Sequence, residues 1–260
     1  MAKFITGEEL ENAVYNIIWE AEKTLLIVSP YIKLDDYFKR LFDKHSNNPK
    51  IHIIIVFGKN EGAISKSLSV ADFEYFKKFL NISVVYAPKL HAKYYGNELK
   101  GVITSINLYD YSFKHNIEFG VYSEMNLLSA ISTSADKEAW NTCMHIAEEH
   151  EIVFTKRPVY DKKLFTKNFI KSDILHDVTE NFYSGISVRK RSGAVKKLGD
   201  FPDEIELGAS NPTARPTREE VGTTQGFCIR TGVPIPFNPK RPFIDNAYRS
   251  WGQRKFLGTG

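Results

Sequence analysis

Five polar residues between positions 91 and 118 have types and spacings that suit phosphoryl transfer without a metal ion. His91 is followed two residues later by Lys93, Ser105 is followed two residues later by Asn107, and Glu118 comes last. Cleavage of a phosphodiester without a metal needs a nucleophile, a cation for the non-bridging oxygens and a proton donor for the leaving oxygen. Histidine suits the first and third roles because its unperturbed pKa lies near neutrality.

The spacing of these residues predicts that strands present them. Residues two apart project from one face of a strand, so we expect Lys93 beside His91 and Ser105 beside Asn107. In this interpretation His91 attacks phosphorus and forms a covalent phosphohistidine. Lys93 and Asn107 bind the non-bridging oxygens. Glu118 accepts the imidazole N–H and thereby fixes the tautomer of the histidine.

The same residues resemble the signature of the phospholipase D superfamily, which is H-x-K, four residues, an Asp, and later G/S-S-x-N. The matching segments of this chain are His91-Ala92-Lys93, Thr104-Ser105-Ile106-Asn107 and Glu118 in an E-x-G-V context. The resemblance covers residues 20–150. It implies that His91 is the nucleophile and that Lys93 and Asn107 bind phosphate. It also implies that Glu118 orients the histidine and that Ser105 is an accessory donor.

One position departs from the signature. Where the superfamily has Asp, this chain has Glu98. In the superfamily that acid is chiefly structural and does not touch phosphate. The exchange adds a methylene and keeps the charge, so we expect a poorer fit and no loss of chemistry.

The chain contains the histidine motif once. The remaining histidines lack it, namely His45, His52, His115, His145, His150 and His176. Because the chemistry requires one attacking and one proton-donating histidine, a single motif predicts a two-fold homodimer with both His91 side chains at its axis. Single-motif chains of this kind resemble bacterial nucleases that dimerise.

Hydrophobic periodicity predicts alternating helices and strands. Helices are expected over residues 8–23, 34–44, 70–80 and 135–149, and strands over 24–32, 51–57, 83–86, 90–95, 101–107 and 117–123. Residues 51–57 (IHIIIVF) are almost continuously apolar, which is typical of a strand covered on both faces. The order of the elements predicts an α/β fold with a mixed, mostly parallel sheet between helix layers, of the phospholipase D-like type.

Three regions are expected along the chain. Residues 1–155 form the catalytic domain, residues 156–225 a basic linker or extension, and residues 226–260 a small β-rich, ribbon-like segment. In the final region Cys228 occupies one of four positions that have the spacing of a zinc ribbon, and the other three are not cysteines. We therefore expect no zinc there. A degenerate ribbon and a proline-rich extension docked on the main domain both fit this segment.

Two further groups of residues are candidates for substrate binding. Arg189, Lys190 and Arg191 begin a basic run that either tracks nucleic-acid phosphates or is a solvated linker. His115 either lines the cleft or belongs to a solvated loop before Glu118.

Composition restricts the compartment and the partners. The net charge of +4 is a mild basic bias, compatible with a polyanionic partner such as DNA. Two widely separated cysteines argue against a disulfide framework and fit a reducing cytoplasm. The N-terminus lacks the pattern of a signal peptide, and the sequence has no apolar run long enough to span a membrane.

The residues predict a metal-independent phosphodiesterase without a cofactor. The resemblance, together with the mild basic charge, implies a nuclease that acts on DNA, and the cysteine usage fits the cytoplasm. The resemblance also implies a role in restriction or antiphage defence, with a partner such as an ATPase or helicase that chooses the target. Two alternatives remain: a phosphodiesterase that acts on phospholipids or nucleotides, and a catalytically inactive binding module.

Overall fold

The computed structural model describes residues 2–59, 64–109, 116–124, 135–163, 166–184, 195–207, 225–229, 231–238 and 242–246. Contacts divide the chain into one unit over Met1–Gly208 and a second over Ala209–Gly260. The larger unit contains the whole histidine motif.

Three parallel strands form the centre of the larger unit. They are β2 (Thr24–Val28), β4 (His52–Gly58) and β5 (Ile82–Ala87), and they lie side by side in the order β2-β4-β5. Their side chains are almost all buried, because helices cover both faces of the sheet. The strands predicted from continuous apolar runs are therefore confirmed.

Antiparallel strands extend this centre on both sides. Within the described residues the large sheet has ten strands, in the order β1-β9-β7-β6-β2-β4-β5-β10-β11, and β12 pairs with β10. The flanking strands are β1 (Lys3–Thr6), β6 (Tyr94–Asn97), β7 (Lys100–Thr104), β9 (Phe119–Glu124), β10 (Glu151–Lys163), β11 (Thr166–Asp177) and β12 (Ile205–Leu207). The mixed α/β class predicted from the sequence is confirmed.

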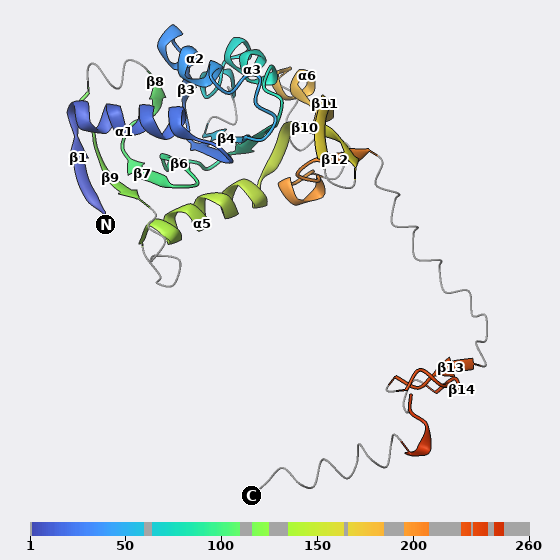
Figure 1. Ribbon diagram of the computed structural model, residues 1–260. Helices are drawn as coiled ribbons and strands as arrows, with labels where there is room; N and C mark the ends of the chain where they lie inside the picture. The colour runs from blue at the N-terminus through green and yellow to red at the C-terminus, as the bar shows by residue number, and fades with distance from the viewer. Residues whose placement is uncertain are drawn as a thin grey trace, which may run out of the picture. The chain divides into compact units, whose positions relative to one another are not determined.

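Helices pack on the two faces of the sheet (Figure 1). One face carries α1 (Gly7–Glu20), α2 (Asp36–Asp43) and α3 (Val70–Lys77), and the opposite face carries α5 (Ala135–Glu149). Two of the helices begin at side-chain caps: Asp35 accepts from Phe38 N at 2.8 Å, and Ser69 accepts from Asp72 N at 3.1 Å. A separate pair of short strands is formed by β3 (Ile32–Lys33) and β8 (Leu108–Tyr109). The short helical elements of this unit are η1 (Ile64–Lys66), α6 (Thr179–Tyr183) and η4 (Leu198–Asp200).

The sheet continues beyond the boundary expected near residue 155. That position lies inside β10, which pairs with β5 on one side and with β11 on the other. Pairing of β12 with β10 brings residues 205–207 into the same sheet. Residues 156–207 therefore contribute strands to the larger unit, although their many charged residues resemble a linker.

The second unit contains a short antiparallel ribbon, formed by β13 (Gln225–Phe227) and β14 (Pro234–Pro236). Between the strands the chain turns at Gly232, whose φ of 69° lies in the left-handed region that glycine tolerates. Cys228 is buried, and its backbone N–H donates to Val233 O at 2.8 Å. The expectation of a small β-rich segment agrees with these strands.

Glu98 holds the turn between α1 and β2. Its carboxylate accepts hydrogen bonds from the backbone N–H groups of Glu22, Lys23 and Thr24, at 2.9, 3.2 and 3.1 Å. Backbone donors at the start of a central strand are thus satisfied by one side chain, which fixes where β2 enters the sheet. Glu98 therefore has a structural role, at the opposite end of β6 from Lys93.

We predict that Glu98→Ala lowers the free energy of unfolding by about 2–3 kcal/mol, because hydrogen bonds to a charged group are lost and three backbone donors lose their acceptor. Glu98→Asp should cost about 1 kcal/mol, because the shorter side chain reaches fewer of the three donors. Denaturant unfolding measures both values. Glu22→Ala in the same turn is the matched control, because the side chain of Glu22 is exposed, and its effect should stay within about 0.5 kcal/mol. Equal effects of Glu98→Ala and Glu22→Ala would contradict this role of Glu98.

Candidate active site

His91 and Lys93 lie directly before β6, at the carboxyl ends of the parallel strands. Strand β6 runs antiparallel to β2, and its first residue, Tyr94, is paired with Val28, the last residue of β2. The backbone there is fixed by a hydrogen bond from Thr104 N to Lys93 O at 3.2 Å. His91 is exposed and Lys93 half-buried. Both side chains line one cavity of about 430 Å³.

The junction of β7 and β9 brings Ser105 and Glu118 into contact. Ser105 follows β7, and Glu118 precedes β9. Ser105 N donates to Phe119 O at 3.1 Å, Phe119 N donates to Ser105 Oγ at 3.2 Å, and Ser105 Oγ donates to the carboxylate of Glu118. Asn116 Nδ2 donates to the other oxygen of Glu118 at 3.3 Å. The carboxylate of Glu118 is therefore held by neutral donors.

Asn107 presents the donor end of its amide to solvent. Its Oδ1 atom is buried and has no hydrogen-bond partner among the described residues, which leaves Nδ2 as the accessible end. The neighbouring backbone is fixed, because Leu108 N donates to Ser29 Oγ at 3.2 Å and Tyr109 N to Asn107 O at 2.7 Å. Ser29 is fully buried. Its role is to join the end of β2 to the segment that carries Asn107.

Lys59 is a further candidate site residue, one that the sequence does not single out. It follows Gly58 at the end of β4, and its positive charge acts on His91. Its φ of 88° is unusual for a lysine and marks local backbone strain, which is common at functional sites. The ammonium group lies over the ring of Tyr31, 5.7 Å from its centroid. The sequence feature that could have identified Lys59 is its position directly after a buried parallel strand, because sites form at the carboxyl ends of such strands.

Gly58 allows the close approach of strands that places Lys59. A Cβ atom at Gly58 would lie 1.8 Å from Ala87 O, on the neighbouring strand β5. Ser67 Oγ also donates to Gly58 O. A residue with a side chain would push the ends of β4 and β5 apart, at the edge of the sheet where His91 lies.

The charges of Lys93 and Lys59 hold the pKa of His91 below its ordinary value, with burial as a lesser cause. The lowered pKa favours the unprotonated imidazole, which is the form that can act as a nucleophile. Among the described residues its ring makes no hydrogen bond, and within one chain Glu118 contacts Ser105 and Asn116 instead. The tautomer-fixing role of Glu118 stays a prediction.

The wall of the cavity opposite His91 is α5. Glu138, Thr142 and Cys143 line it from that helix. Burial raises the pKa of Cys143 to about 12, so its thiol is protonated at neutral pH and is no competing nucleophile. In the part of the chain that the structure describes, no three His, Cys, Asp or Glu side chains form a group that could hold a metal ion.

The strands that carry the site are shorter than expected. Prediction placed His91 and Lys93 inside a strand over residues 90–95, but β6 begins at Tyr94. It also placed Ser105 and Asn107 inside a strand over residues 101–107, but β7 ends at Thr104. The cause is local: Thr104 Oγ1 accepts from Ile106 N at 3.2 Å and donates to Phe119 O at 2.9 Å, which ends the regular pairing. The site residues therefore lie in the loop that precedes β6 and in the loop that follows β7.

Four predicted binding residues lie outside the described residues, namely His115, Arg189, Lys190 and Arg191. Their part in binding stays a prediction.

Comparison with known proteins gives similarities of fold. No family model matches the chain, and no curated protein matches it. Among solved structures, the chain is similar to Nuc, a phospholipase D family member from Salmonella typhimurium, with 12% identity over 58% of this chain and 98% of that one and a TM-score of 0.45. It is similar to NucT from Helicobacter pylori, with 12% identity over 58% and 97% and a TM-score of 0.46.

A third similarity is to phosphatidylserine synthase from Haemophilus influenzae, with 12% identity over 78% of this chain and 42% of that one and a TM-score of 0.46. At these identities the likeness concerns the fold alone.

We predict that NMR titration of His91 gives a pKa below the ordinary value of about 6.5, and that Lys59→Gln raises it because one of the two neighbouring positive charges is removed. Added salt should raise it in the same direction by screening both lysines. Lys163→Gln is the control, since Lys163 is exposed and pairs with Asp161 on β10, and it should leave the titration unchanged. An unchanged titration in Lys59→Gln would place Lys59 outside the site.

Proposed function

We propose that the chain is a metal-independent phosphodiesterase that acts on DNA as a nuclease through a phosphohistidine. The observation that carries this proposal is His91, an exposed imidazole with a lowered pKa beside Lys93 and Lys59. Two cations and the amide donor of Asn107 suit the oxygens of a phosphodiester. This combination supports attack on phosphorus better than it supports acid–base chemistry alone.

The reaction takes place in two displacements. An unprotonated nitrogen of His91 forms a bond to phosphorus and the bond to the leaving oxygen breaks. A second histidine, which enters this step protonated, gives that oxygen its proton and becomes neutral. Water then attacks the phosphohistidine, loses a proton to the same second histidine, and returns His91 to its starting form. Lys93, Lys59 and Asn107 neutralise the charge on the non-bridging oxygens in both steps.

The second histidine is assigned to the partner of a two-fold homodimer, because the chain carries one copy of the motif. Exposed apolar side chains beside the site support this assignment. Phe4 on β1, Ile103 on β7 and Val121 on β9 are register neighbours on one face of the sheet, and Phe119 stacks on Phe4 at 5.7 Å between ring centroids. We name these four residues the β1–β9 patch. It adjoins Glu118 and is continuous with the cavity at His91, which Ile103 also lines.

Charge and cysteine usage bear on the substrate and the cellular compartment. The net charge of +4 suits a polyanion such as DNA. Both cysteines are free and buried, which fits a reducing compartment such as the cytoplasm. In the described chain no helix has the length and apolar character that a membrane crossing needs. A role in restriction or antiphage defence, with an ATPase or helicase as partner, is part of the proposal by resemblance.

We predict that His91→Ala lowers plasmid cleavage at least about a thousandfold, because no phosphohistidine can form, whereas EDTA leaves the wild-type rate unchanged. The assay is plasmid nicking with phospholipid vesicles as a parallel substrate. His145→Ala is the control, because His145 is exposed on α5, and it should cleave normally. Full activity of His91→Ala, or strict dependence on Mg²⁺, would overturn the mechanism. Cleavage of lipid in place of plasmid would change the substrate.

The β1–β9 patch gives a test of the composite site. We predict that the wild-type chain sediments as a dimer at micromolar concentration and that Phe4→Glu, which puts a charge on the patch, sediments as a monomer. The monomer should lose cleavage by about a hundredfold or more, because the second histidine is missing. Ile174→Glu is the matched control, since Ile174 is similarly exposed on β11, and it should stay dimeric and active. A monomer that cleaves at the wild-type rate would remove the composite site.

A further inference from the structure

The two short strands that follow Tyr31 and Asn107 present a lysine and a tyrosine on their outer face. Strands β3 and β8 are parallel, with Ile32 paired to Leu108 and the next two residues, Lys33 and Tyr109, paired to each other. Ile32 and Leu108 are buried, so alternation along a strand turns Lys33 and Tyr109 away from the core. Lys33 is exposed, and its Nζ lies over the half-buried ring of Tyr109, 5.1 Å from the ring centroid.

A second pair of a tyrosine and a lysine lies where these strands begin. Tyr31 and Asn107 directly precede the first paired residues of β3 and β8, so their backbones are neighbours. Ser29 joins the two segments, because its Oγ donates to Tyr31 O at 2.7 Å and accepts from Leu108 N at 3.2 Å. Tyr31 is half-buried, and Lys59 Nζ lies 5.7 Å from the centroid of its ring.

Ser67 fixes Lys59 beside Tyr31. Its Oγ donates to the carbonyl of the last residue of β4, directly before Lys59. Its own carbonyl accepts from Ile32 N, directly after Tyr31, at 2.7 Å. Lys59 therefore lies against Tyr31 and is also close enough to His91 for its charge to lower the pKa of that histidine. The ring of Tyr31 is thus adjacent to the candidate active site.

We name these four side chains the β3–β8 face, namely Tyr31, Lys33, Lys59 and Tyr109. Aromatic rings beside cations are the groups with which proteins hold a single nucleic-acid strand, because bases stack on the rings and phosphates contact the cations. A lysine side chain is long and flexible, so its ammonium group can move from a ring to a phosphate when a base takes its place. The β3–β8 face therefore has the chemistry of a binding site for unpaired nucleotides.

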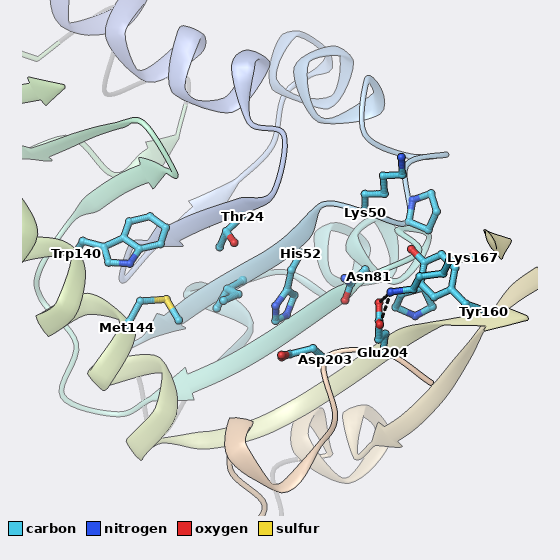
Figure 2. A pocket seen from close by; sticks show the side chains of 13 residues that line it. Thr24, Lys50, His52, Asn81, Trp140, Met144, Tyr160, Lys167, Asp203 and Glu204 are labelled. Carbon is cyan, nitrogen blue, oxygen red and sulfur yellow. Dashed lines mark hydrogen bonds and ion pairs between the residues drawn. The ribbon is translucent and has the colours of Figure 1, made fainter. Parts of the chain in front are cut away.

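The opposite end of the parallel strands lacks such a surplus of positive charge. A cavity of about 690 Å³ lies there, at the amino ends of β2 and β4 (Figure 2). Its lining lysines, Lys50 and Lys167, are balanced by Asp203 and Glu204, and Lys167 forms an ion pair with Glu204. By contrast, neither lysine of the β3–β8 face pairs with an acid in the part of the chain that the structure describes. A polyanionic strand is therefore better matched by the carboxyl ends of the strands.

We propose that the β3–β8 face is a subsite for a single strand of DNA whose scissile phosphate lies at His91, with unpaired bases against Tyr31 and Tyr109 and a neighbouring phosphate on Lys33. This inference rests on the proposed function, because the phosphate at His91 determines where the strand enters. It adds the form of the substrate. A base inside a duplex is covered on both faces by its stacked neighbours, so the two rings select unpaired bases, and they do so without regard to sequence.

The test measures binding of labelled oligonucleotides to the full-length His91→Ala chain by fluorescence anisotropy, so that no cleavage disturbs the equilibrium. A short oligodeoxythymidylate should bind at least about tenfold more tightly than a duplex of the same length. It should also bind at least about tenfold more tightly than an abasic strand of the same length, which keeps the phosphates and lacks the bases. The comparison with the abasic strand needs no change in the β3–β8 face, so it does not depend on how a variant folds.

Two variants separate stacking from charge. Tyr109→Leu should weaken binding of the thymidylate by about fivefold or more and leave binding of the abasic strand unchanged. Lys33→Gln should make the slope of log affinity against log salt concentration shallower by about 0.7, whereas Tyr109→Leu should leave that slope unchanged. Trp19→Leu is the matched control and should bind as the parent does. Its ring is also exposed and lies under a lysine, Lys44 at 4.6 Å, but it belongs to the end of α1 that leads into the start of β2.

Four results would overturn the proposal: no oligonucleotide binds, the duplex binds as tightly as the single strand, the abasic strand binds as tightly as the thymidylate, or Tyr109→Leu leaves the affinity for the thymidylate unchanged. All of them are read on protein without the nucleophile. Plasmid cleavage by His91→Ala would instead overturn the proposed function, so the failure of one proposal is distinguishable from the failure of the other.

Discussion

The candidate active site depends on the hydrogen bonds that join the end of β7 to the start of β9. Phe119 is central to them, because its carbonyl accepts from Ser105 N and Thr104 Oγ1 and its N–H donates to Ser105 Oγ. These hydrogen bonds lie where β7 ends and β9 begins, and so hold Ser105 and Glu118 together. Thr104 N also bonds to Lys93 O, which places the histidine motif against this junction. Three segments that are separate in the sequence thus meet at one junction.

The sequence predicted the central strands of the sheet better than its outer strands. The apolar runs of β2, β4 and β5 were sufficient, because burial on both faces dictates their composition. Strand β10 was missed entirely, because it contains Pro158 and several charges, and its later residues pair with β11 and β12 away from the centre. The spacing of His91 and Lys93 was the signal from which the chemistry was predicted. No such spacing marks Lys59, because it comes near His91 only when β4 and β5 pair.

Two histidines have lowered pKa values for different physical reasons. Charge repulsion from Lys93 and Lys59 acts on exposed His91, so solvent ions weaken it. Burial is the larger cause of the lowered pKa of His52, and the charge of Arg157 is the smaller one. Added salt should therefore change the pKa of His52 little. The first arrangement lowers the pKa of a histidine that solvent reaches. The second lowers the pKa of a histidine whose ring is bonded to buried Ser83.

The pairing of β1 with β9 has a consequence for how the protein acquires its site. Residues 3–6 pair with residues 119–122, so the edge of the sheet beside Glu118 closes only after most of the intervening chain has been made and ordered. Closing so long a loop is entropically costly, and contacts between distant parts of a chain slow folding. During synthesis the first strand therefore pairs with β9 only once residues 119–122 have been made.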